Sequence, residues 1–121
     1  MRVLKLVDSI TELGLHDAGC IAVSGSHGGI SSARYALSAR PLLSVFNDAG
    51  GGLNNAGVAA LDLLQGHILA ACTVSHSSAC IGQAKSTLQN GVISHCNLMA
   101  RKLGVDAGHT CQSVVDRLQN S

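Results

Sequence analysis

The sequence is nearly without aromatic residues, with no tryptophan, one tyrosine (Tyr35) and one phenylalanine (Phe46) among 121 residues. Apolar residues nevertheless make up 46% of the chain, so its core must be built from Ala, Val, Leu and Ile at close range. Nucleic-acid binding relies on clustered basic side chains and stacking aromatics, whereas the eight basic and seven acidic residues here are scattered. We therefore expect no nucleic acid among the partners.

Charged residues are also scarce, at 12% of the chain, which leaves little surface for solvation. We expect other copies of the chain to cover the apolar excess, and so predict a homo-oligomer. The five cysteines are odd in number and form no CxxC pair, so the sequence indicates neither a disulfide framework nor a zinc ribbon. Reduced thiols are the simpler interpretation.

Long apolar runs are absent as well. The segment Met1–Asp8 is too short and too interrupted for the core of a signal peptide, and no later run approaches the length needed to span a membrane. The sequence therefore predicts no membrane partner and a cytoplasmic location.

Three short runs have the composition of β-strands: Cys20–Ser24, Leu42–Phe46 and Ile68–Val74. They are almost continuously apolar, which is typical of parallel strands covered on both faces, and a further strand is expected at Val3–Val7. Helix-compatible stretches lie between the three runs. These are Ile30–Ala39 and Asn55–Gln65, with Pro41 and Gly66 as stop signals and Asn54 or Asn55 as a cap.

The C-terminal part of the chain is predicted to be helical, over Ala79–Gln89, Val92–Leu103 and Cys111–Leu118. The whole chain, residues 1–121, is therefore predicted to form one α/β domain. Its fold is a small, mostly parallel sheet with a βαβαβ core, layered as in Rossmann-like and flavodoxin-like folds, and completed by C-terminal helices.

Polar, glycine-rich loops follow the three runs, at Ser24–Gly29, Asn47–Asn55 and Ser75–Ser78. The carboxyl ends of parallel strands meet at one edge of the sheet, so we expect these loops to form a single small-molecule site. Glycine N–H groups and helix starts favour an anionic or carbonyl ligand, although glycine and serine are also ordinary turn formers.

Twelve residues are candidates for binding the ligand, because they lie in these loops or project from the neighbouring helices. They are Ser24, Gly28, Gly29, Arg34, Asn47, Gly50, Gly51, Asn54, Ser75, Ser78, His95 and Asn97. Arg34 lies one turn beyond Gly29, where its guanidinium could clamp a carboxylate.

Catalytic candidates come from the same loops. Ser24-Gly25-Ser26-His27-Gly28 resembles the nucleophile elbow G-x-S-x-G of α/β-hydrolases and lacks only its first glycine. Ser26, Asp48 and His76 also follow that family's order of nucleophile, acid and base, so the analogy covers one pentapeptide and an ordering. In this hypothesis Ser26 attacks, His76 accepts the proton, and Asp48 orients the imidazole, while the N–H groups of residues 27–29 hold an oxyanion. His95 also comes after Asp48 in the chain, and His27 and His95 could likewise serve as acid or base. For Ser26, a turn or capping hydroxyl is the competing interpretation.

Other motifs do not fit. The glycine spacing of Gly52–Gly57 matches a P-loop, but Val58 and Ala59 replace the Lys and Ser/Thr, and no G-x-G-x-x-G follows a strand. We therefore expect no nucleotide cofactor. A zinc site from His27, His76 and His95, with or without Asp48, is chemically reasonable, but no H-x-H or H-E-x-x-H spacing supports it.

The sequence thus predicts a small cytoplasmic enzyme that acts on a small polar or anionic metabolite by acid–base or nucleophilic chemistry. Hydrolysis of an ester or amide is the reaction it favours. The alternatives are a non-catalytic regulatory module that binds an anion or small ligand, and a subunit that completes a partner's active site.

Overall fold

The computed structural model describes residues 2–51 and 53–120, with the backbone alone at 53–55. Its centre is a five-stranded sheet in the order β1-β2-β3-β4-β5. The first four strands are mutually parallel, and β5 runs antiparallel to β4, so the predicted mostly parallel sheet is confirmed. The strands are β1 (Leu4–Val7), β2 (Ile21–His27), β3 (Leu43–Asn47), β4 (Ala70–Val74) and β5 (Ile93–Cys96).

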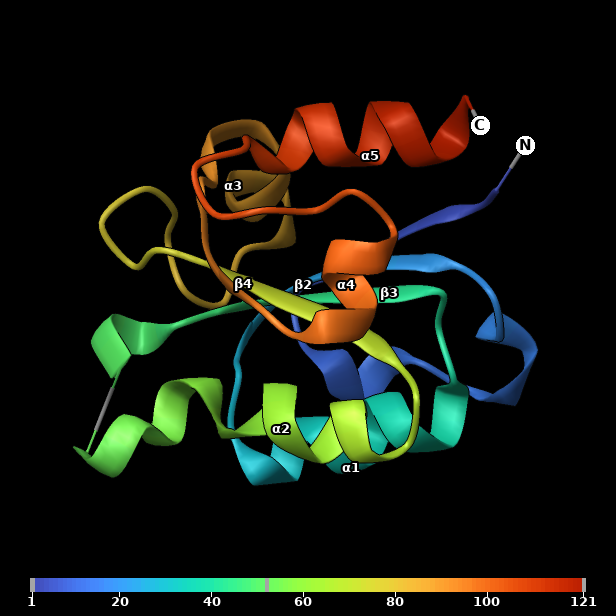
Figure 1. The fold of residues 1–121 in the computed structure, drawn as a ribbon, viewed down its shortest axis with the longest axis horizontal. Coiled ribbons are helices and arrows are strands. Elements are labelled where there is room, and N and C mark those ends of the chain that lie inside the picture. Colours follow the sequence, from blue (N-terminus) through green and yellow to red (C-terminus); the bar gives the residue numbers. More distant parts are fainter. Residues whose placement is uncertain (1, 52, 121) are drawn as a thin grey trace.

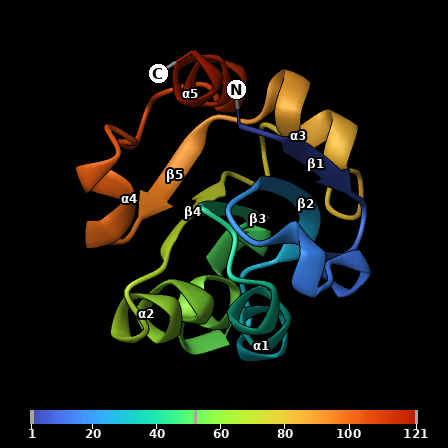
Figure 2. The same ribbon diagram turned by 90° about the vertical axis from the view of Figure 1, so that its right-hand side faces the viewer.

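Helices cover both faces of this sheet (Figures 1 and 2). The strand order advances in one direction from β1 to β4, and right-handed crossovers then place every connection on the same face. That face carries α1 (Ile30–Ala39) and α2 (Ala59–Gly66), which pack against each other. The opposite face carries α3 (Ala84–Asn90), α4 (Leu98–Lys102) and α5 (Cys111–Gln119). Within the described ranges, no helix is long and apolar enough to cross a membrane.

Short 3-10 helices supplement these elements in the connections. They are η1 (Ile10–Glu12) and η2 (Leu15–Asp17) between β1 and β2, and η3 (Ala49–Gly51) and η4 (Leu53–Val58) between β3 and α2.

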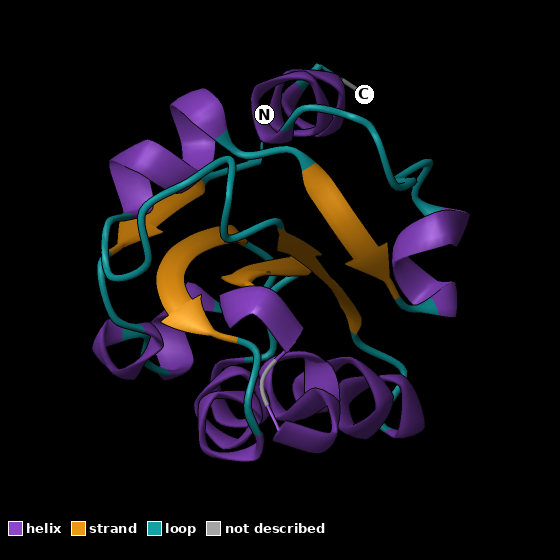
Figure 3. Cartoon of the chain, turned by 90° about the vertical axis from the view of Figure 1, so that its left-hand side faces the viewer, coloured by secondary structure: helices purple, strands orange, loops and turns teal. Residues whose placement is uncertain are grey.

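The two faces of the sheet bury separate apolar cores, as the alternation of side chains along each strand requires. On β2, Ile21 and Val23 belong to the core under α3–α5, whereas Ala22 belongs to the core over α1 and α2. On β3, Val45 belongs to the core under α3–α5, and Phe46 belongs to the core over α1 and α2. Figure 3 shows the strands enclosed between the two helical layers.

Three helix predictions are wrong in extent. Residues 92–103 are not one helix, because Ile93–Cys96 pairs with β4 as an edge strand and only Leu98–Lys102 is helical. The helix α2 begins at Ala59 instead of Asn55, after the 3-10 stretch η4, and its N-cap is Val58. The helix α3 begins at Ala84 instead of Ala79.

Residues 75–83, which we call the crossing segment, explain the late start of α3. The chain enters β4 from α2 on one face of the sheet and afterwards reaches α3, which packs on β2 from the opposite face, so this segment passes over the ends of β3 and β2. Two hydrogen bonds hold it there. Asn47 Nδ2 at the end of β3 donates to Ala79 O (3.1 Å), and Gly82 N donates to Gly25 O on β2 (2.7 Å).

The contact at Gly25 predicts a sensitive position. A Cβ atom added there would lie 2.3 Å from Gln83 N and 2.4 Å from Gly82 C, both backbone atoms that cannot turn aside. We expect Gly25→Ala to lower the free energy of unfolding by about 2–3 kcal/mol, as overpacking does. Gly66→Ala is the matched control, because nothing lies within 4 Å of its added Cβ. It should leave stability unchanged or raise it by up to about 1 kcal/mol. Urea unfolding measures both variants, and equal stabilities would refute the tight contact.

Candidate functional site

Asp48 and His76 form a linked pair where β3 and β4 end. Asp48 directly follows β3 and is 6% exposed, and its N–H donates to Val74 O on β4 (2.9 Å). Its carboxylate oxygen Oδ1 accepts from Gly50 N (2.8 Å) and from His76 N (3.0 Å). The ring atom Nδ1 of His76 lies 3.5 Å from the same oxygen. Two loops that the sequence predicted to converge therefore do so.

The surroundings of Asp48 favour its ionised form. Burial opposes ionisation, but the N–H groups of Gly50 and His76, the Ser94 hydroxyl and the imidazole together hold the pKa of Asp48 below its ordinary value. An ionised carboxylate beside Nδ1 favours the tautomer that carries its proton there. The other ring nitrogen, Nε2, is then free to accept a proton, and the side chain is 62% exposed. His76 is thus arranged as a general base.

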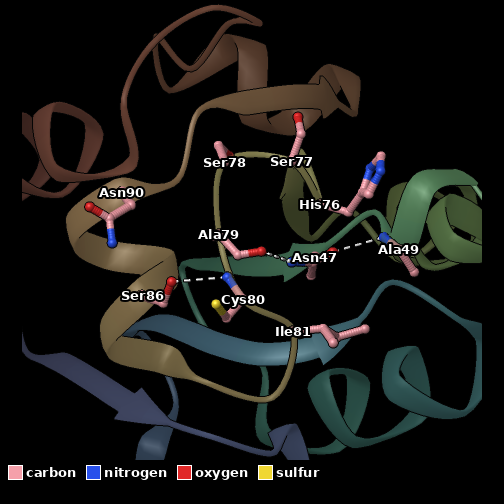
Figure 4. A pocket seen from close by; sticks show the side chains of 10 residues that line it. All are labelled: Asn47, Ala49, His76, Ser77, Ser78, Ala79, Cys80, Ile81, Ser86 and Asn90. Atoms are coloured by element: carbon pink, nitrogen blue, oxygen red, sulfur yellow. Dashed lines mark hydrogen bonds between the residues drawn. The ribbon is translucent and has the colours of Figure 1, made fainter.

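A pocket of about 500 Å³ adjoins this pair. Figure 4 shows His76 and Ala49 on one side of it and Ser86 and Asn90 of α3 on the other, with Asn47, Ala79 and Cys80 between. Its remaining lining residues are Ser77, Ser78 and Ile81. The crossing segment therefore supplies most of the wall, and α3 closes the far side.

Ser26 lies in a different hollow, of about 450 Å³. That hollow lies between the η1 region, the end of β2 and the start of α1, and Ile81 is its boundary with the pocket beside His76. The Ser26 hydroxyl accepts a hydrogen bond from Ile10 N (2.9 Å). The structure therefore brings Asp48 and His76 together and places Ser26 apart from them.

Of the other two candidate histidines, His27 lies apart from the Asp48–His76 pair, whereas His95 is linked to it through Ser94. His27 lines the hollow with Ser26, and its Nδ1 accepts from Gly29 N (3.2 Å), which leaves the ring proton on Nε2. His95 is on β5, with Nδ1 3.4 Å from Thr73 Oγ1 and 3.2 Å from Ser94 Oγ. Across the described residues, no three His, Cys, Asp or Glu side chains are grouped to hold a metal ion, so the zinc alternative has no site there.

The glycine N–H groups that the sequence suggested for anion binding have partners inside the protein. Gly28 N donates to Asn47 O (3.0 Å) and Gly29 N to His27 Nδ1, while Gly50 N and Gly51 N donate to Oδ1 and the backbone oxygen of Asp48. Close backbone contact is what needs a glycine at position 28, because a Cβ there would lie 2.5 Å from Gly57 O. These N–H groups hold the loops together in the structure, and the ligand-binding role of the glycines stays a prediction.

Several predicted binding side chains have structural roles. The Ser24 hydroxyl donates to Val45 O, and Asn47 bonds to Ala79 O and Ala49 N. Asn97 caps α4 and bonds to Ala71 N, Leu61 O and Leu69 O. It lies at the amino end of β4, because β5 is antiparallel, so it is at the opposite edge of the sheet from the pocket.

The remaining predicted binding residues do not lie together at one site. Ser75 and Ser78 bond to each other and hold the turn that follows β4 (2.8 Å between hydroxyl oxygens), although Ser78 also lines the pocket. Arg34 lines a shallow hollow on the outer face of α1 with Ser31, Tyr35 and Ser38. The side chain of Asn54 lies outside the described residues.

The sequence reasoning missed Cys80, Ser86, Asn90 and Ser94. Cys80 is exposed and lines the pocket. Ser94 reaches Asp48 because residues 93–96 form a strand, which the predicted helix obscured. The glycine at position 82 and the apolar–polar alternation of Ile93-Ser94 are the signals that would have indicated a longer loop and a strand.

The lowered pKa of Asp48 predicts a pH-dependent contribution to stability. A carboxyl whose pKa is lower in the folded than in the unfolded chain stabilises the fold at pH values above its unfolded pKa of about 3.9. This stabilisation is lost as the pH falls through the pKa of the folded state. We expect Asp48→Asn to cost about 1–2 kcal/mol at pH 7 and progressively less towards pH 3. Asp62→Asn on α2 is the control, because that side chain is exposed and should contribute little at any pH. Urea unfolding between pH 3 and 7 tests this, and a pH-independent loss in Asp48→Asn would contradict it.

Comparison with known proteins found no match. No protein-family model fits the chain, and no curated protein or solved structure is similar to it.

Proposed function

We propose that this protein is a small-molecule enzyme in which His76 acts as general base and Asp48 orients it. The observation that carries this proposal is the Asp48–His76 pair. Nδ1 of His76 lies 3.5 Å from Oδ1 of Asp48, and His76 lines a pocket of about 500 Å³. Hydrolysis of an ester or amide of a small polar metabolite is the reaction class that we favour.

The proposed chemistry uses water as the nucleophile. Nε2 of His76 removes a proton from water as its oxygen forms a bond to the substrate carbonyl carbon. Asp48 stabilises the resulting imidazolium, which then returns the proton to the leaving oxygen or nitrogen as its bond to carbon breaks. Ser86 accepts a hydrogen bond from Cys80 N (2.9 Å), so its own proton, like the Asn90 amide, is available to hold a substrate oxygen.

A serine nucleophile has less support. Ser26 belongs to the neighbouring hollow, whereas the base is in the pocket on the other side of Ile81. Cys80 lines the correct pocket, but Figure 4 shows its thiol separated from the His76 ring by Asn47 and Ala79. Nucleophilic catalysis requires the nucleophile and the base within hydrogen-bond reach, which favours water.

The second candidate is the non-catalytic binding module. The observation that favours it is the Ser26 hollow, which carries the hydroxyls of Ser9, Ser31 and Tyr35 and in which, among the described residues, no ion pair joins Asp8 to His27. Stabilisation of the protein by small ligands without their turnover would support this candidate.

A homo-oligomer remains part of the proposal. Val3, Leu6 and Leu15 are 66%, 43% and 81% exposed, on or near the open edge strand β1. Pairing or packing of a second copy at this edge would remove them from water. Light scattering after size-exclusion chromatography should give a mass above the 12.3 kDa of one chain, and a monomer at micromolar concentration would refute it.

The catalytic proposal predicts a specific dependence on His76. We expect p-nitrophenyl acetate to be hydrolysed, and His76→Ala to lower kcat/KM by about 10²–10⁴-fold, the usual contribution of a general base. His67→Ala is the matched control, because His67 is exposed beyond α2 and would account for any hydrolysis by an ordinary surface imidazole. Ser26→Ala should leave the rate within about twofold if water is the nucleophile. Equal losses in His76→Ala and His67→Ala would contradict the proposal, and a large loss in Ser26→Ala would restore the serine mechanism.

A further inference from the structure

The pocket beside His76 is lined by apolar surface and a few polar groups, and it has no fixed charge in its own wall. Among its ten lining residues there is no Asp, Glu, Lys or Arg. Besides the His76 ring and the Cys80 thiol, its polar groups are the hydroxyls of Ser77 and Ser86 and the Asn90 amide, since Asn47 and Ser78 are bonded inside the protein. Hydroxyls and amides both donate and accept hydrogen bonds, so they suit an uncharged polar ligand.

Several backbone N–H groups near the pocket are not available to an anion. An anion site without basic side chains needs several free N–H groups directed at one point. The N–H groups of Gly50 and Gly51, next to Ala49 in the pocket wall, both donate to Asp48. Cys80 N donates to Ser86 Oγ, and Ser78 N donates to Ser75 O. Four N–H groups near the pocket are therefore already used inside the protein.

A negative charge adjoins the pocket on the His76 side. Asp48 is buried directly behind His76, and its lowered pKa means that the carboxylate is ionised at neutral pH. In the part of the chain that the structure describes, its one ion-pair partner is His76 itself. A carboxylate or phosphate bound beside the ring would face this charge with no cation opposite, which is unfavourable.

We infer that the pocket takes an uncharged carbonyl compound, a neutral ester or amide, and disfavours carboxylates and phosphates. This inference rests on the proposed function and narrows its substrate class, since the sequence left anionic and carbonyl ligands both open. The substrate's apolar part would contact Ala79 and Ile81, and its oxygen would receive a hydrogen bond from Ser86 or Asn90.

Cys80 offers a way to measure this selectivity without any assumption about catalysis. Its thiol is exposed in the pocket, whereas Cys20, Cys72 and Cys111 are buried and Cys96 is half-buried. Iodoacetamide and iodoacetate alkylate a thiol by the same reaction, in which the thiolate sulfur displaces iodide. They differ in charge, because iodoacetamide carries an uncharged amide and iodoacetate a carboxylate. The ratio of their alkylation rates at Cys80 therefore measures how strongly the pocket disfavours an anionic reagent relative to an uncharged one.

The experiment measures both alkylation rates at Cys80 by peptide mass spectrometry at pH 8 and low ionic strength, in the folded chain and in the urea-unfolded chain. We expect the iodoacetamide-to-iodoacetate ratio to be roughly threefold higher in the folded protein, as one carboxylate several ångströms away predicts. Asp48→Asn should return the ratio to the unfolded value, while Asp62→Asn should keep the wild-type ratio. Added salt should also reduce the wild-type difference, which tests the charge effect without a variant. A folded ratio equal to or below the unfolded one would overturn the inference.

Hydrolysis of two esters separates this inference from the proposed function. We expect uncharged p-nitrophenyl acetate to be preferred to the anionic mono-p-nitrophenyl ester of succinic acid, with both rates dependent on His76. Faster His76-dependent hydrolysis of the succinate ester would refute the substrate class and retain the catalytic function. No His76-dependent hydrolysis of either ester, with the alkylation preference intact, would refute the catalytic function and retain the pocket's selection for uncharged ligands.

Discussion

The close approach of the crossing segment to β2 is the contact on which the site depends. The strand order from β1 to β4 runs in one direction, so the parallel part of the sheet has no point where two connections diverge to opposite faces and leave a crevice between them. The chain makes its change of face only after β4, through residues 75–83. Because Gly25 has no side chain, this segment can lie directly on the end of β2 and form two hollows there.

Asp48 links the site to the stability of the fold. Its backbone continues the β3–β4 pairing, while its carboxylate receives the N–H groups of two separate loops and the imidazole of His76. The interactions that keep the carboxylate ionised are therefore the ones that shape the η3 turn and fix the base. A residue of this kind gives both a structural and a catalytic defect when it is changed, so pH profiles are needed to separate the two effects.

Much of the sheet could be predicted from the sequence, because strands covered on both faces have a composition that local pattern reveals. Cys20–Ser24, Leu42–Phe46 and Ile68–Val74 each fall within or beside an observed strand. The strand β5 could not be predicted in the same way, since its four residues are stabilised by pairing with β4, a contact distant in sequence. The convergence of Asp48 and His76 followed from the rule that parallel strands end at one edge, whereas the separation of Ser26 depended on the path of the crossing segment. Glycine-rich loops were the most ambiguous signal, because glycine serves backbone packing as readily as ligand binding.

Ile81 lines both hollows, and this shared wall has a consequence for how the protein can vary. A shorter side chain at this position would enlarge the two cavities together, and a bulkier one would shrink at least one of them. The volumes of both cavities therefore depend on the residue at position 81. A change of ligand in one cavity that leaves the other unchanged would need substitutions at residues that line only one of them. Asn90 lines only the pocket beside His76, and Tyr35 lines the Ser26 hollow but not that pocket.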